Sequence, residues 1–152
     1  SLMEIRAKCR RLKQKHDLRL VVIDYLQLMS SGKKVESRQQ EVSEFSRALK
    51  LLAKEIDCPV IAISQLNRGS EQRTDKTPMM SDLRESGSIE QDADVILLIH
   101  REDYYEKESA RAGEADLIVA KHRNGATKTI PVAFEGHYSR FKDMAHSGGF
   151  SG

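Results

Sequence analysis

The sequence has few of the residues that build metal centres, disulfide scaffolds or membrane spans. Among 152 residues there are 2 cysteines, 5 histidines and no tryptophan. Cys9 and Cys58 are far apart and lack both zinc-ligand spacing and the cysteine density of a disulfide scaffold, so we expect reduced thiols in a cytoplasmic protein. The histidines are scattered, which argues against a zinc site. No apolar run is long enough for a membrane span and no signal-peptide pattern opens the chain, so no membrane association is expected.

An excess of charge is also missing. Lys and Arg number 25 against 23 Asp and Glu, a formal net charge of +2. There is therefore no global electrostatic attraction to nucleic acid, and any basic surface must be local. An apolar stripe at helical spacing predicts a helix at the start of the chain, formed by Leu2, Ile5, Cys9 and Leu12. The other faces of this helix carry cations, which suits either a solvated surface or phosphate binding. The hydrophobic fraction of 39% is ordinary for a globular domain with a real core.

A phosphate-cradling loop is the most informative absence. Gly32-Lys33 is the nearest approach to one. The Walker A pattern requires another glycine five residues before Gly32, and that position is Gln27. Because the main-chain N–H groups and the lysine of this loop supply most phosphate binding, the chain by itself is expected not to hydrolyse ATP.

The central feature that is present is an apolar run at 20–23 that ends on Asp24. Continuous β-branched residues without alternation predict a strand covered on both faces, as in a parallel α/β sheet. A carboxylate that closes such a strand lies at the ligand-binding edge of the sheet, where it can hold hydrated Mg²⁺ against nucleotide phosphates. This is the Walker B pattern, although an ordinary strand entering a turn can look the same.

A helix and a second strand follow. Residues 36–56 have the period of an amphipathic helix, with a Ser37/Gln40 capping box and an end before Pro59. Its predicted apolar stripe consists of Val42, Phe45, Leu49, Leu52 and Ile56. Residues 60–64 predict another buried strand, closed by Gln65. A βαβ unit would bring Asp24 and Gln65 to one sheet edge, where the glutamine could cap a turn or sense a γ-phosphate or its attacking water.

The second half predicts a buried strand at 94–100 and a further strand at 117–120, after a polar, mobile loop at 67–80. Asn124-Gly125 is a strong hairpin signal, with type I′ geometry expected and the chain returning as a strand at 129–134. Lys121 and Arg123 are two residues apart and should share a face near the hairpin tip. Such cations are either solvated charge or part of a site.

Four motifs occur in an order that closely resembles the DnaB family of bacterial hexameric replicative helicases. They are Leu20-Val21-Val22-Ile23-Asp24-Tyr25-Leu26-Gln27-Leu28, Ile63-Ser64-Gln65-Leu66-Asn67-Arg68, Asp82-Leu83-Arg84-Glu85-Ser86-Gly87-Ser88-Ile89-Glu90-Gln91-Asp92-Ala93-Asp94 and Lys121-His122-Arg123-Asn124-Gly125. The resemblance covers the whole chain apart from its tail.

The resemblance implies an α/β, RecA-like fold, with a largely parallel central sheet flanked by helices and a C-terminal β-hairpin. Residues 1–146 would be the C-terminal portion of the motor domain, a partial domain lacking the P-loop strand, and 147–152 a flexible tail. The family uses ATP and Mg²⁺, forms homo-hexamers around single-stranded DNA, moves 5′ to 3′ on the encircled strand, and works with a primase and a helicase loader in the primosome.

The resemblance also implies residue roles. Asp24 resembles the Walker B acid, acting on Mg²⁺ through water, and Gln65 resembles the γ-phosphate sensor. Arg84, Glu85 and Gly87 fall where the family contacts the DNA backbone. Arg123 resembles the arginine finger that enters a neighbouring subunit's ATP site, with Lys121 as a second cation; these two, Asp24 and Gln65 form the expected catalytic and nucleotide-binding set.

Two alternatives remain open from the sequence. A recombinase-type RecA-like ATPase shares the architecture of a strand that ends on an acid, although the DNA-contact motif and the finger hairpin favour the helicase. The second alternative is a non-catalytic fragment that only binds DNA or a protein partner, which fits the missing P-loop.

Overall fold

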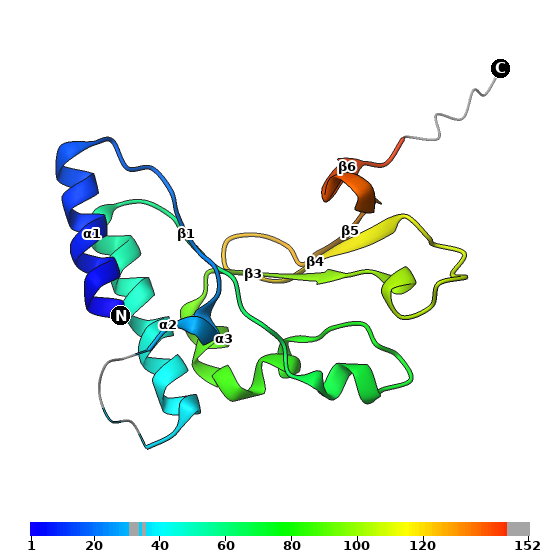
Figure 1. The fold of residues 1–152 in the computed structure, drawn as a ribbon, viewed down its shortest axis with the longest axis horizontal. Coiled ribbons are helices and arrows are strands. Elements are labelled where there is room, and N and C mark those ends of the chain that lie inside the picture. Colours follow the sequence, from blue (N-terminus) through cyan, green and yellow to red (C-terminus); the bar gives the residue numbers. More distant parts are fainter. Residues whose placement is uncertain (31–33, 35, 146–152) are drawn as a thin grey trace. The chain divides into compact units, whose positions relative to one another are not determined.

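The computed structural model describes residues 1–30, 34 and 36–145, with backbone alone for 84–86. The tail predicted at 147–152 and the Gly32-Lys33 pair lie outside the described residues. The chain divides into two compact units, Ser1–Ala93 and Asp94–Gly152, shown in Figure 1. No helix among the described residues is long and apolar enough to cross a membrane.

Unit 1 is a βαβ arrangement preceded by a helix. Helix α1 spans Leu2–Lys15, and a capping box between Ser1 and Glu4 fixes its start. Strands β1 (Val21–Ile23) and β2 (Val60–Ala62) pair in parallel, with Val22 opposite Ile61. Helix α2 connects them. The predicted βαβ unit is therefore confirmed, with strands shorter than the apolar runs that predicted them.

Helix α2 spans Arg38–Ile56 and has the predicted amphipathic character. The Ser37 side chain caps it by accepting a hydrogen bond from the Gln40 N–H at 3.2 Å, which is one half of the predicted capping box. At its other end Asp57 adopts a left-handed conformation with φ of 49°, which ends the helix before Pro59. All five residues of the predicted stripe are buried.

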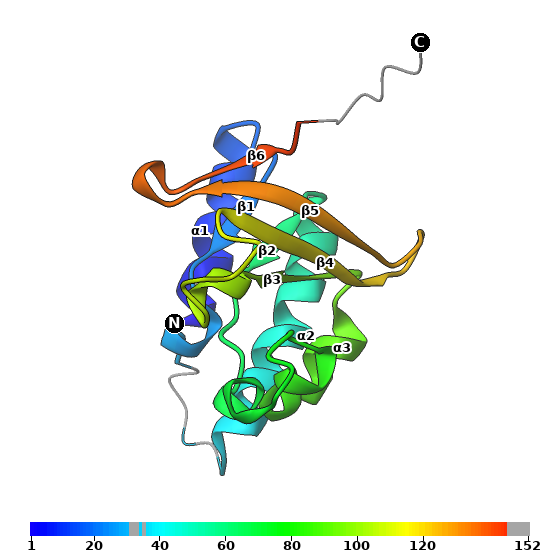
Figure 2. The same ribbon diagram turned by 90° about the vertical axis from the view of Figure 1, so that its right-hand side faces the viewer.

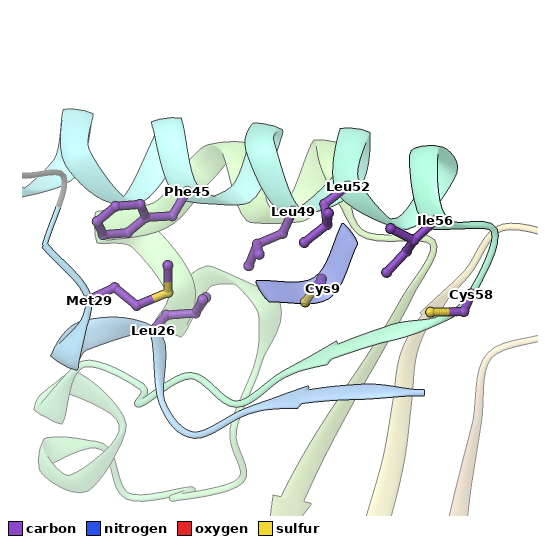
Figure 3. Packing of buried hydrophobic residues seen from close by; sticks show 8 residues of the cluster. All are labelled: Cys9, Leu26, Met29, Phe45, Leu49, Leu52, Ile56 and Cys58. Atoms are coloured by element: carbon purple, nitrogen blue, oxygen red, sulfur yellow. The ribbon is translucent and has the colours of Figure 1, made fainter. Parts of the chain in front are cut away.

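The stripe of α2 forms the core of unit 1. Figure 3 shows Phe45, Leu49, Leu52 and Ile56 pointing from α2 towards side chains of other segments of the chain. Those side chains are Leu26, Met29, Cys9 and Cys58. Both cysteines are free, and burial raises the pKa of the Cys9 thiol, so they serve as small apolar core residues.

Within the described residues of unit 1, the β1–β2 pair is covered on one face. Val21, Ile23 and Val60 pack against the core cluster. Val22 and its partner Ile61 are 55% and 51% exposed. The predicted burial of both faces is therefore wrong for the described part of unit 1, because the continuous apolar pattern makes both faces apolar while α1 and α2 supply cover for one.

Short helices complete unit 1. They are η1 (Leu26–Leu28), η2 (Arg68–Gln72), η3 (Met80–Ser86) and α3 (Gly87–Asp92). Helix α3 packs on α2, where the Ser46 hydroxyl donates a hydrogen bond to Asp92 at 2.8 Å. The Asp24–Tyr25 peptide bond between β1 and η1 is cis.

Unit 2 is a four-stranded antiparallel sheet in the order β3-β4-β5-β6, visible in Figure 2. Its strands are β3 (Val95–His100), β4 (Glu114–His122), β5 (Lys128–Glu135) and β6 (Arg140–Asp143). In β3, Ile96 and Leu98 are buried while the residues on either side of each are exposed. The continuous apolar run of β3 therefore alternates in burial, unlike the fully buried strand predicted at 94–100.

The α/β, RecA-like class expected from the sequence is confirmed. The sheet was expected to be largely parallel, and the described strands pair mostly antiparallel. Among the described strands only β1 and β2 pair in parallel. The links between β3, β4, β5 and β6 contain short 3₁₀ helices, η4 (Glu102–Tyr104) and η5 (Gly136–Tyr138), or a turn. The β4–β5 and β5–β6 links, at 123–127 and 136–139, are shorter than the roughly dozen residues that a parallel crossover needs, so these strands return antiparallel.

Candidate nucleotide and DNA site

The ends of β1 and β2 define the first part of the candidate site. Because the two strands are parallel and in register, with Ile23 opposite Ala62, their carboxyl ends lie at the same sheet edge. Asp24 follows β1 directly, and Gln65 follows β2 after two further residues. Both are exposed. The structure thus brings both strand-closing residues to one edge, as the sequence predicted.

The single carboxylate at this edge is compatible with a hydrated magnesium ion. No group of three or more His, Cys, Asp or Glu side chains that could hold a metal occurs in the part of the chain that is described. Mg²⁺ keeps most of its water ligands and commonly takes one or two carboxylates, so a single exposed acid such as Asp24 suffices for a water-mediated contact.

The main chain of Gln65 is held by the side chain of Gln27 in η1. The Gln65 N–H donates to Gln27 Oε1 at 3.1 Å, and Gln27 Nε2 donates to the Gln65 carbonyl at 3.3 Å. The same Nε2 donates to Ser64 Oγ at 3.0 Å. The segment after Asp24 is therefore tied to the segment that contains Gln65.

The expected DNA-contact residues lie in η3 and at its junction with α3. Arg84 and Glu85 belong to η3, and Gly87 is the first residue of α3. Gly87 has right-handed helical angles (φ of −53°, ψ of −23°) and is exposed, and a Cβ there would meet nothing within 4 Å. Neither the turn nor packing among the described residues thus requires glycine at this position.

An ion pair between the partly exposed Arg73 and the buried Asp82 fixes the loop before these residues. Arg73 donates two hydrogen bonds to the Asp82 carboxylate, at 2.7 and 3.0 Å, and a third to the Thr77 carbonyl at 2.8 Å. Asp82 is 4% exposed and also accepts from the Met79 N–H at 2.8 Å. The loop predicted at 67–80 therefore contains η2 and is anchored at its end, which spacing in the sequence did not reveal.

Lys121 and Arg123 lie in unit 2, at the end of β4 and in the turn after it. Val95 is the register partner of His122, so the next residues of the two strands, Asp94 and Arg123, also face each other. The Arg123 N–H donates to the Asp94 carbonyl at 2.9 Å, and the two side chains form an ion pair at 3.3 Å. Arg123 lies beyond the strand, so the alternation rule behind its predicted shared face with Lys121 does not apply.

The β4–β5 hairpin is confirmed, but its predicted turn type is wrong. The Gly125 N–H donates to the His122 carbonyl at 3.2 Å, which places Arg123 and Asn124 at the centre of the turn. Neither Asn124 nor Gly125 has a positive φ, as a type I′ turn at Asn-Gly would require. The glycine instead allows a close approach, since a Cβ on Gly125 would clash with the His122 ring.

A surface depression of about 430 Å³ lies elsewhere in unit 1, between α1 and the end of α2. Its lining residues are Arg10, Lys13, Gln14, Glu55 and Ile56. It includes none of the predicted site residues, and Glu55 within it is already paired with Arg6 and Arg10. The candidate functional residues therefore lie in three places. Two are in unit 1, at the ends of β1 and β2 and in the η3–α3 segment, and the third is the β4–β5 hairpin of unit 2.

Comparison with known proteins identifies the family of the chain. The sequence matches the DnaB-like helicase C-terminal domain family over residues 1–143. The replicative DNA helicase DnaB of Leifsonia xyli subsp. xyli is 77% identical over 145 residues, which are 95% of this chain and 32% of that protein. The chain thus spans about a third of the length of this relative.

Solved structures show the same relationship. A DnaB-like replicative helicase, described with its interactions with primase, superimposes with a TM-score of 0.90 at 48% identity, over 95% of this chain and 36% of that one. A solved structure of an ATPase domain superimposes with a TM-score of 0.91 at 48% identity, over 95% of this chain and 52% of that one. The fold is that of part of a RecA-like helicase ATPase domain. The chain belongs to the DnaB-like helicase C-terminal domain family, which favours the helicase over the recombinase and the non-catalytic alternatives.

Proposed function

We propose that residues 1–146 form the later part of the motor domain of an ATP-dependent hexameric replicative helicase, with 147–152 as a tail. The complete protein would act in the cytoplasm and unwind duplex DNA at the fork, moving 5′ to 3′ on the encircled strand. The observation that carries this proposal is the parallel β1–β2 pair, whose ends put Asp24 and Gln65 at one sheet edge in a chain of this family.

Asp24 would hold Mg²⁺ through a water molecule, and Gln65 would contact the γ-phosphate or its attacking water. Bound Mg²⁺ would neutralise charge that develops on the phosphates during hydrolysis. The exposure of both residues supports these roles, since each is open to a ligand. Gln65 also connects the nucleotide edge, along the chain, to the loop that ends in η3.

Arg84, Glu85 and Gly87 would contact the backbone of single-stranded DNA. An arginine can neutralise a phosphate, and a glycine leaves its N–H unobstructed by a side chain. The open space around Gly87 supports this role. Glu85 would repel a phosphate, so it would act through its main chain, a water molecule or an arginine partner. Phosphate contacts carry no sequence information, which suits a motor that travels any template.

Arg123 would serve as the arginine finger of a neighbouring subunit's ATP site in a homo-hexamer, with Lys121 as the second cation. To do so its side chain must leave Asp94, which is feasible because both side chains are about half exposed and such pairs are weak. Primase is a fitting partner, because one matching structure is described with its primase interactions. A helicase loader is expected on the family resemblance.

Asp24→Asn in the complete helicase subunit tests this proposal. ATP hydrolysis and unwinding of a forked duplex should fall roughly a hundredfold, since a metal-held charge supplies several kcal/mol in the transition state. Asp17→Asn is the matched control, because Asp17 is an exposed carboxylate before the opposite end of β1. Unwinding by Asp24→Asn at the rate of Asp17→Asn would contradict the proposal.

A further inference from the structure

The side-chain amide of Gln27 continues the β1–β2 pairing beyond the point where the strands end. The last rungs of the main-chain ladder are the Ile63 N–H to the Ile23 carbonyl at 2.9 Å and the Leu26 N–H to the Ile63 carbonyl at 2.8 Å. Beyond Ile63, the chain that follows β2 makes no further main-chain hydrogen bond to the segment that follows β1, among the bonds described. Gln27 takes that place by bonding both the N–H and the carbonyl of Gln65.

The orientation of this amide is chemically determined. The Gln65 N–H must face an oxygen, which places Oε1 there and turns Nε2 towards the Gln65 carbonyl and Ser64 Oγ. Both hydrogens of the Nε2 group then have an acceptor. A glutamate at this position would lose both donors, and an apolar side chain would lose all three hydrogen bonds. Glutamine is the side chain of this length that satisfies the whole set.

The segment that carries Gln27 is itself held by α2. Arg38 donates to the Gln27 carbonyl at 2.6 Å and to the Met29 carbonyl at 3.0 Å, and its guanidinium is paired with Glu41. Leu26 and Met29, on either side, are buried in the core cluster. Gln27 therefore projects from a short segment that is fixed by packing and by an arginine, as a residue that positions another one should.

From this geometry we propose that Gln27 is a positioning residue for Gln65. It holds the peptide of Gln65 so that the exposed side chain meets the γ-phosphate in one orientation, and it does not touch the nucleotide itself. The inference rests on the proposed role of Gln65 as the sensor. A misplacement of about 1 Å at a reacting group can lower a rate about a hundredfold, so loss of this support should be measurable in turnover.

The test compares Gln27→Met, Gln65→Ala and the double variant in the complete helicase, with Gln39→Met as the matched control. Methionine keeps the side-chain length and removes the three hydrogen bonds; Gln39 is an exposed residue of α2. We expect Gln27→Met to lower the kcat of DNA-stimulated ATP hydrolysis about 10- to 100-fold, with the KM for ATP within about twofold. The double variant should be no slower than Gln65→Ala alone, because both changes act through one residue.

The outcomes separate this inference from the function on which it rests. If the two changes multiply in the double variant, or if Gln27→Met behaves like Gln39→Met, Gln27 does not act through Gln65, while the role of Gln65 stands. If Gln65→Ala hydrolyses ATP at the normal rate, the sensor role fails and the inference fails with it. If Gln27→Met does not assemble, Gln27→Ala carries the same comparison. A lower melting temperature with unchanged kcat per assembled hexamer would indicate a merely structural role and overturn the proposal.

Discussion

Replacing Arg123 by alanine should abolish most ATP hydrolysis without harming the fold. In this chain Arg123 is paired with Asp94 at 3.3 Å, and the two side chains are 49% and 55% exposed. An exposed pair of this kind contributes about 0.2–1 kcal/mol. An arginine finger contributes about 10³–10⁵ in rate, roughly 4–7 kcal/mol at 1.36 kcal/mol per tenfold. The two interpretations therefore differ by orders of magnitude in turnover.

The assay is steady-state ATP turnover of the assembled hexamer, measured beside nucleotide affinity and thermal unfolding. Arg123→Ala should lose about a thousandfold or more in kcat and keep near-normal Mg²⁺-nucleotide binding, because the guanidinium matters chiefly as charge develops in the transition state. Arg140→Ala is the control, since Arg140 is also an exposed arginine of unit 2 paired with a carboxylate, Glu135. Equal turnover in the two variants would refute the finger assignment.

The remaining predictions concern DNA binding and acid stability. Arg84→Ala should weaken single-stranded DNA binding on all sequences and reduce the salt slope of log K by about 0.7, as for one lost phosphate contact; an unchanged slope would exclude this contact. Two hydrogen bonds from Arg111, at 2.7 and 2.8 Å, hold the pKa of Asp116 below its usual value. A lowered pKa adds stability above the unfolded value of about 3.9, which is lost as pH falls through the folded value. The other charged neighbours, His100 opposite on β3 and Glu114 beside Arg111, are unchanged in Asp116→Asn. The melting temperature of Asp116→Asn should therefore fall less between pH 7 and pH 3 than that of the unsubstituted chain. Equal falls would contradict this prediction.

Helix α2 and the two strand ends were predictable because their signals are local and repeated. The stripe from Val42 to Ile56 recurs over the whole helix, and Ser37 and Pro59 mark its limits. Asp24 and Gln65 each close an apolar run, and parallel pairing then brings both to one edge. These inferences needed only periodicity and the geometry of a βαβ unit.

Strand β6 and the antiparallel character of unit 2 were not predictable in the same way. Arg140–Asp143 is four exposed residues long, which gives no apolar pattern. Its pairing with β5 depends on the turn at Gly136–Tyr138 and on Ser139, whose φ is 47°. An apolar run such as 95–99 predicts a strand but not its direction, because direction is set by the connection that follows.

The supporting residues of the site were missed for a different reason. Gln27 lies 38 positions before Gln65 and contacts its main chain. Main-chain groups have no sequence signature, so no spacing could indicate the contact. Arg73 and Asp82 are ordinary charged residues in a polar segment, and only the folded loop shows that Asp82 is buried and bound by Arg73. Residues that act by holding another residue's backbone become visible only in the structure.

The most direct test of the proposed function is hydrolysis by mixed hexamers. Subunits with Arg123→Ala and an intact P-loop are combined with P-loop mutants that retain Arg123, and mixed rings are verified by mass. Each mixed ring contains interfaces with one intact P-loop and one intact finger, so ATP hydrolysis should recover to a clear fraction of the normal rate. Mixed rings that form and hydrolyse no faster than either mutant alone would contradict a finger that acts between subunits.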